Sequence, residues 1–148
     1  MTEKIDCFDG EFAFLSNFYP AKVEFEGLRY PTSEHAFQAA KTLDQKIRQE
    51  FITECETPGK AKRKGNKLCL RPDWEDIKLD IMTTIVRNKF YTNPELAEKL
   101  QATGDAILIE GTTWHDTFWG IDLKTGEGEN HLGQILMKIR DELKNKEG

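Results

Sequence analysis

The sequence lacks the cysteine and histidine patterns that define disulfide scaffolds and metal sites. Three cysteines occur in 148 residues, an odd number at wide spacing. Neither a disulfide framework nor a CxxC metal site is therefore indicated. The three histidines form no HExxH or HxH pattern. We expect a protein that uses no metal and no cofactor.

A long apolar run is also absent. No stretch approaches the roughly 18–20 apolar residues that a membrane-spanning helix needs. The first ten residues, MTEKIDCFDG, lack the charged and then apolar plan of a signal peptide. The sequence therefore predicts a cytoplasmic protein that does not bind a membrane.

Positive charge is in deficit, with 21 basic against 26 acidic residues and a net charge of −5. This charge balance argues against sequence-independent binding of nucleic acid over a broad surface. The local exception is KAKRKGNK (60–67), which has five basic residues in eight positions and is followed by Arg71. A solvated helix end and a phosphate-binding segment explain this cluster equally well.

What the chain does contain indicates one continuous domain, residues 1–148, of the α+β class. Strands are expected at 4–8, 11–15 and 106–110, with a hairpin over 22–30 that turns at Glu26-Gly27. Helices are expected at about 33–42, 44–55, 59–66, 73–91, 94–103 and 131–144. The expected fold is a single compact, mainly helical domain with a small sheet of short strands.

The stretch YPTSEHAFQAAK (30–41) predicts a helix that Thr32 caps. At about 100° per residue, Glu34, Gln38 and Lys41 fall on one side of this helix and its apolar residues on the other. Taken alone, this pattern indicates a solvated polar stripe opposite a core stripe.

Two segments that are expected to be loops, FLSNFYP (14–20) and TTWHDTFWG (112–120), are rich in aromatic and small polar residues. Aromatic rings in loops can stack on a planar heterocycle, and short polar side chains can bind sugar hydroxyls. For any single ring, a simpler expectation is that it packs into the core at the end of a small sheet. Phe18, Trp114 and Trp119, taken together with Glu34, favour a ligand site.

Seven short motifs follow one another from about Cys7 to Arg140. They are FLSNFYP, YPTSEHAFQAAK, RPDW, NKF, TGD-x-x-L-x-E (103–110), D-x-x-WG (116–120) and N-x-LG-x-x-LM-x-x-R (130–140). Together they resemble the NADAR, or YbiA-like, family. The resemblance implies an α+β domain that hydrolyses N-glycosidic bonds. Some members act on ribosylated pyrimidines of early riboflavin synthesis, and others remove ADP-ribose from guanine in nucleic acid. One departure is Asp122, where many members have glycine.

Cleavage of a ribose–nitrogen bond builds positive charge at C1′, so the enzyme needs a carboxylate nearby. Glu34 is the expected catalytic group, and the family has a glutamate at the matching position. Gln38, one turn later, is expected to orient Glu34, a water or a sugar hydroxyl. Lys41 has two open roles: it forms a Schiff base with the sugar, or it neutralises a phosphate or Glu34. His35 is expected to pack or cap.

The other expected site residues bind substrate rather than react. They are Ser16, Asn17, Phe18, Tyr19, Arg71, Trp74, Glu110, Asp116, Trp119, Gly120 and Asn130. A surface position is the alternative for Glu110 and Asp116. The simpler expectation for Asn130 is that it caps the last helix.

The sequence therefore predicts an N-glycosidase whose partner is a small ribosylated heterocycle or ADP-ribosyl-guanine in nucleic acid. In the second case residues 60–71 are the only candidate for a basic rim. A non-catalytic sensor of NAD or ADP-ribose remains an alternative, although such a sensor should lose Glu34. A metal-dependent hydrolase is a third, and the chain offers no ligand cluster for it.

Overall fold

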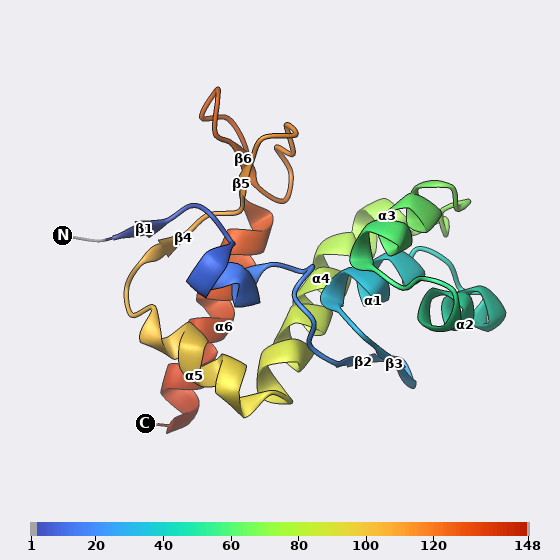
Figure 1. Cartoon of the computed structure of the whole chain (residues 1–148), viewed down its shortest axis with the longest axis horizontal. Helices are drawn as coiled ribbons and strands as arrows, with labels where there is room; N and C mark the ends of the chain where they lie inside the picture. Colours follow the sequence, from blue (N-terminus) through green and yellow to red (C-terminus); the bar gives the residue numbers. More distant parts are fainter. Residues whose placement is uncertain (1–2, 148) are drawn as a thin grey trace. The chain divides into compact units, whose positions relative to one another are not determined.

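A computed structural model describes residues 3–147 of the chain (Figure 1). Two compact units can be distinguished, one formed by the segments up to Ser16 and from Pro94 onward, the other by Asn17–Asn93. The single domain expected from the sequence stays a prediction.

The Asn17–Asn93 unit begins with a β-hairpin. Strands β2 (Val23–Phe25) and β3 (Leu28–Tyr30) pair antiparallel, with Val23 opposite Tyr30. Glu26 and Gly27 both have positive φ angles, 46° and 88°. Two successive left-handed residues form the tight turn that matches the twist of a hairpin. The expected hairpin is confirmed.

Four helices follow in this unit: α1 (Ser33–Ala39), α2 (Gln45–Thr53), α3 (Pro58–Asn66) and α4 (Trp74–Tyr91). As expected, Thr32 caps α1, because its Oγ1 accepts a hydrogen bond from the backbone N–H of His35 at 3.1 Å. Pro58 occupies the first turn of α3, where its missing N–H costs nothing. Helix α1 packs against α2, α3 and α4, and all of its residues are buried.

The other unit combines short strands with two helices. Strand β1 (Lys4–Ile5) lies parallel to β4 (Ile107–Leu108), and β5 (Gly111–Thr112) lies parallel to β6 (Ile121–Asp122). Helices α5 (Pro94–Ala102) and α6 (His131–Glu147) pack against each other, and α6 also covers β4. Leu132, Leu136 and Ile139 of α6 are buried, as its expected helical periodicity requires.

The strand expected at 11–15 is wrong. Gly10–Leu15 form a 3₁₀ helix, η1, in which the N–H of Phe12 bonds to Asp9 O and that of Ser16 to Ala13 O, both at 2.9 Å. The adjacent residues Phe14 and Leu15 are both buried. A strand would direct adjacent side chains to opposite faces, whereas a tight helix buries both.

The α+β class is confirmed, with helices predominating. In residues 3–147 the strands form three separate two-stranded pairs. None of the helices within those residues is both long enough and apolar enough to span a bilayer.

Candidate active site

Glu34 and Gln38 form a buried pair on α1. The Nε2 of Gln38 donates a 2.6 Å hydrogen bond to Oε2 of Glu34. The two residues are 8% and 4% exposed. The expectation of a solvated polar stripe is therefore wrong. Burying a carboxylate is costly unless hydrogen bonds compensate, so this pair is a strong indication of a functional site.

Helix α3 fixes where Gln38 lies. A β-carbon added at Gly65 would collide with Oε1 of Gln38 and crowd its Cδ and Cβ. This oxygen is buried and has no hydrogen-bond partner among the described residues. Only glycine at position 65 leaves room for the Gln38 side chain, which in turn holds the Glu34 carboxylate.

Lys41 lies just beyond the end of α1 and is half-buried. Its N–H donates to Gln38 O at 3.2 Å, and its carbonyl accepts from the N–H of Arg71 at 2.9 Å. Burial lowers the pKa of the Lys41 amine; the Glu34 carboxylate opposes this effect and the positive charge of Lys62 reinforces it. At a given pH, a larger fraction of Lys41 is therefore neutral and able to act as a nucleophile.

His35 has the structural role expected for it. Its Nδ1 lies 2.7 Å from Thr32 Oγ1, and its Nε2 lies 3.0 Å from the carbonyl of Cys55. Burial lowers the pKa of His35, because it disfavours the charged imidazolium. Both ring nitrogens are thus engaged in holding α1 in place.

Three expected site residues of the FLSNFYP segment, Asn17, Phe18 and Tyr19, belong to the same unit as Glu34. The carbonyl of Asn17 accepts the backbone N–H of Glu34 at 3.0 Å, and its side chain is buried against Sδ of Met82. Phe18 is 43% exposed. The Nζ of Lys89 lies 5.8 Å from the ring centroid of Tyr19. Asn17 therefore adjoins Glu34 directly, and Phe18 offers an accessible ring.

Arg71 adjoins Lys41, whereas Trp74 lies in the core. The Arg71 guanidinium bonds twice to the carboxylate of Asp73, at 2.7 and 3.2 Å, and once to Ala40 O at 3.4 Å. Asp73 stands at the start of α4, but its carboxylate is bound by Arg71 and makes no capping bond. The Trp74 ring is 5% exposed and packs 5.1 Å from Phe37. Its expected contact with substrate stays a prediction.

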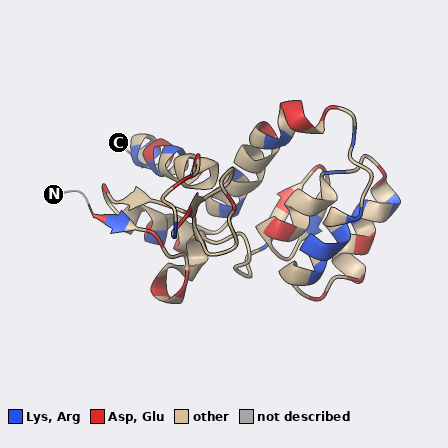
Figure 2. Cartoon of the chain, turned by 90° about the horizontal axis from the view of Figure 1, so that it is seen from above, with Lys and Arg blue, Asp and Glu red and all other residues tan. Residues whose placement is uncertain are grey.

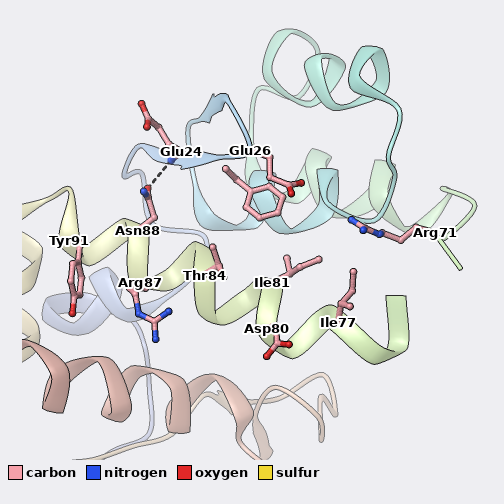
Figure 3. Close-up of a pocket in the computed structure, with 11 residues that line it drawn as sticks. Glu24, Glu26, Arg71, Ile77, Asp80, Ile81, Thr84, Arg87, Asn88 and Tyr91 are labelled. Carbon is pink, nitrogen blue, oxygen red and sulfur yellow. Dashed lines mark hydrogen bonds between the residues drawn. The ribbon is translucent and has the colours of Figure 1, made fainter. Parts of the chain in front are cut away.

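A cavity of about 600 Å³ lies in the same unit, between the hairpin and one face of α4 (Figure 3). Phe25, Ile77 and Ile81 give it apolar walls, and Arg71 lies at its edge. Arg71 is the only expected site residue that lines it. The buried Glu34 carboxylate and the Lys41 amine of lowered pKa, rather than this cavity, mark the candidate site of reaction.

The remaining expected site residues lie in the other unit, where the side chains of several form hydrogen bonds with backbone groups. Oδ1 of Asp116 accepts the N–H groups of Phe118 at 3.1 Å and Trp119 at 2.9 Å. Asn130 bonds to the N–H of Glu110 and the carbonyl of Leu108, both at 2.9 Å. Its side chain therefore does not cap α6, contrary to that expectation.

Gly120, Trp119, Trp114 and Ser16 belong to the same unit. A β-carbon at Gly120 would collide with the carbonyl of Glu110, so the loop passes directly over the end of β4. Trp119 is half-buried and its ring meets that of Phe118 edge-on at 4.8 Å. Trp114 is 58% exposed, so it does not pack into the core at the end of a sheet. Ser16, half-buried at the end of η1, belongs to this unit as well.

Sequence reasoning missed a pair formed by His115 and Asp122. Nδ1 of His115 lies 2.5 Å from Oδ2 of Asp122. This hydrogen bond raises the pKa of His115 and lowers that of Asp122. The signal was present, because Asp122 departs from the glycine of many family members. Within the described residues, no three His, Cys, Asp or Glu side chains gather as a metal site.

Both the sequence and the fold resemble those of known proteins. The sequence model of the NADAR domain matches residues 7–144. The N-glycosidase YbiA of Escherichia coli (strain K12) is 40% identical over 135 residues, covering 90% of this chain and 82% of YbiA. The NMR structure of E. coli YbiA superposes with a TM-score of 0.85 at 36% identity, covering 99% of this chain and 89% of that one. The chain belongs to the NADAR domain family.

A second relative is longer. The riboflavin biosynthesis protein VVA0006 of Vibrio vulnificus (strain YJ016) is 42% identical over 137 residues, which cover 91% of this chain. The chain spans only 36% of the length of that protein.

Proposed function

We propose that the chain is an N-glycosidase that removes the base from a ribosylamine-type substrate, with Lys41 as covalent nucleophile and Glu34 as proton-transfer group. Its enzyme class is that of its relatives named N-glycosidase: a hydrolase acting on N-glycosyl compounds. The observation that carries the proposal is the buried Glu34 carboxylate, which Gln38 holds at 2.6 Å on the helix that ends just before the half-buried Lys41. Burial lowers the pKa of the Lys41 amine.

The reaction uses the exocyclic amine through which the base is attached. A ribosylamine opens to an imine at C1′, and the neutral Nζ of Lys41 adds to that carbon. The C1′ bond to the base nitrogen breaks, and that nitrogen leaves with a proton supplied through Glu34. Water then hydrolyses the Lys41–C1′ imine. The sum is one water consumed, with the free base amine and the free sugar released and Lys41 restored.

Gln38 and Asn17 keep the carboxylate where this proton transfer needs it. Gln38 holds Oε2 through its amide, and Asn17 holds the backbone of Glu34 through its carbonyl. Preorganised hydrogen bonds of this kind cost no rearrangement during reaction. A pure binding module has no need of a buried carboxylate beside an amine of lowered pKa, so these contacts favour an enzyme over the sensor.

Two substrates fit the proposed chemistry: a ribosylaminopyrimidine phosphate of early riboflavin synthesis, and ADP-ribose attached to guanine. The name of the Vibrio relative supports the first. Both carry phosphate, which the basic residues of α3 could bind (Figure 2). Incubation with each substrate, followed by mass detection of released sugar phosphate or ADP-ribose, tests the activity and separates the two. Release from neither substrate would contradict the proposal.

A further inference from the structure

The three backbone carbonyls that follow α1 are all bound by two arginines. The carbonyl of Lys41 accepts a hydrogen bond from the backbone N–H of Arg71 at 2.9 Å, and that of Ala40 accepts a longer one from its Nη1 at 3.4 Å. The carbonyl of Thr42 accepts a hydrogen bond from Nε of Arg48 at 2.8 Å. Carbonyls at the C-terminal end of a helix lack partners within the helix, and basic side chains can bind them. The segment bound in this way carries Lys41.

Each guanidinium is in turn fixed by a carboxylate from another part of the same unit. Nη1 of Arg48 donates to Oε1 of Glu26, in the hairpin turn, at 2.8 Å. Nε and Nη2 of Arg71 donate to the two carboxylate oxygens of Asp73, just before α4, at 2.7 and 3.2 Å. A guanidinium presents its donors in a rigid plane, so a carboxylate that binds one edge also orients the others. The hairpin, α2 and the start of α4 therefore all act on residues 40–42.

Stability alone does not explain Arg48. Its side chain is fully buried, and its Nη2 has no hydrogen-bond partner among the described residues. A buried charge with an unused donor costs free energy, and an apolar side chain of similar volume is often no less stable in such a place. What the guanidinium adds is a fixed donor to the carbonyl of Thr42, next to Lys41.

We propose that Arg48 and Arg71 are positioning residues, which hold the backbone of residues 40–42 so that the Lys41 amine lies where it attacks the substrate, without themselves touching the reacting atoms. The inference rests on the proposed function, because the placement of Lys41 matters to turnover only if Lys41 reacts. It gives Arg71 a different role from the substrate binding that the sequence suggested. Misplacing a reacting group by about 1 Å can cost about 10²-fold in rate.

The first test is the kinetics of base release by Arg48→Met and Arg71→Met. Both variants lose a guanidinium and keep a long side chain, so kcat should fall by about tenfold or more while KM stays within about twofold. Arg29→Met is the matched control and should keep wild-type kinetics, because Arg29 is exposed and pairs with Glu24 at 2.9 Å on the hairpin. A lower Tm with an unchanged kcat of the folded protein would show a purely structural role and overturn the inference.

If Arg48→Met does not fold, Arg71→Met still decides, because the Arg71 side chain lies at the edge of the cavity and not in the core (Figure 3). The Asp73→Ala variant then separates positioning from substrate binding. It frees the Arg71 guanidinium for a substrate phosphate, so a binding role predicts a lower KM. The positioning role predicts a lower kcat instead, and a double variant no slower than Arg71→Met alone. A lower KM with unchanged kcat would overturn the inference for Arg71.

Hydrogen–deuterium exchange measures the segment directly, without substrate. The N–H groups of Lys41 and Thr42 donate to Gln38 O at 3.2 Å and Ala39 O at 3.3 Å. A loosened segment should expose these amides, so the peptide that contains them should exchange about tenfold faster in the two arginine variants than in wild type or the control. Unchanged exchange, or faster exchange with a wild-type kcat, would overturn the inference. Faster exchange in a protein whose wild type releases no base would instead contradict the proposed function and leave the fixing of residues 40–42 established.

Discussion

Gly65 of α3 and Gln38 of α1 fit together so closely that no further carbon atom can be placed between them. Gln38 in turn donates a 2.6 Å hydrogen bond to the Glu34 carboxylate. A residue without a side chain thus determines where a carboxylate of the candidate active site lies.

The Gly65→Ala substitution should lower turnover through Gln38. The added methyl group pushes the amide away from its place and loosens the bond to Glu34, so kcat should fall by about tenfold or more while the helix remains. Gly59→Ala is the matched control on the same helix, because a β-carbon there meets its nearest atoms at an ordinary 3.7 Å. Equal turnover in the two variants, measured alongside circular dichroism, would argue against this coupling.

The Glu34→Gln substitution removes the carboxylate charge and keeps the size of the side chain. Turnover should fall by about 10²-fold or more, as for other losses of an acid–base group. Thermal unfolding should confirm that the variant is folded, and the exposed Glu56→Gln should behave as wild type. Near-normal release of base by folded Glu34→Gln would remove Glu34 from the mechanism.

The His115–Asp122 pair should make stability depend on pH. The pKa of His115 is raised on folding, so its contribution is fully present below the unfolded value of about 6.5 and is lost as pH rises through the folded pKa. The pKa of Asp122 is lowered, so its contribution is present above about 3.9 and is lost as pH falls through the folded pKa. The pair therefore stabilises most between about pH 4 and 6.5.

The Asp122→Asn substitution tests this window. Its Tm should fall relative to wild type between about pH 4 and 6.5, and the difference should shrink above the raised pKa of His115. Melting curves across this range measure the effect. A difference in Tm that is constant at all pH values would show that Asp122 acts through its backbone contacts, such as the N–H of Lys124, and not through the ion pair.

The Trp119→Ala substitution separates stacking on substrate from packing. If the half-buried ring faces the base, substrate affinity should weaken by about 1–3 kcal/mol. If the ring serves only its contacts with Phe118 and His131, Tm should fall and the affinity of the folded fraction should stay unchanged. Both quantities can be measured on one preparation.

The sequence predicted those elements whose signals are local. Thr32 caps α1 and the Glu26-Gly27 turn closes the hairpin, because a few neighbouring residues decide both features. The strand at 11–15 was predicted wrongly. Phe14 and Leu15 are both buried, and Lys99, far along the chain, lies over the Phe14 ring. Asn130 was expected to cap α6 but binds Leu108, 22 residues away. Side-chain partners at such separations leave no periodic signal.

In the candidate site, too, the local features could be predicted from the sequence and the tertiary ones could not. Helical periodicity predicted that Glu34 and Gln38 meet, since residues four apart lie on one face. It did not predict their burial, which results from the packing of three other helices around α1. The basic cluster of α3 could be noticed in the sequence, but the packing of α3 against α1 could not be predicted from it.

The covalent role of Lys41 is tested most directly by borohydride trapping. Sodium borohydride added during turnover should reduce the imine to a stable secondary amine, and peptide mass spectrometry should place the sugar on Lys41. Lys41→Arg keeps the positive charge but cannot form an imine, so it should show neither adduct nor turnover. If borohydride fixes no sugar to wild-type Lys41 and Lys41→Arg still releases base, the covalent route is wrong, and Glu34 acting directly on water becomes the mechanism.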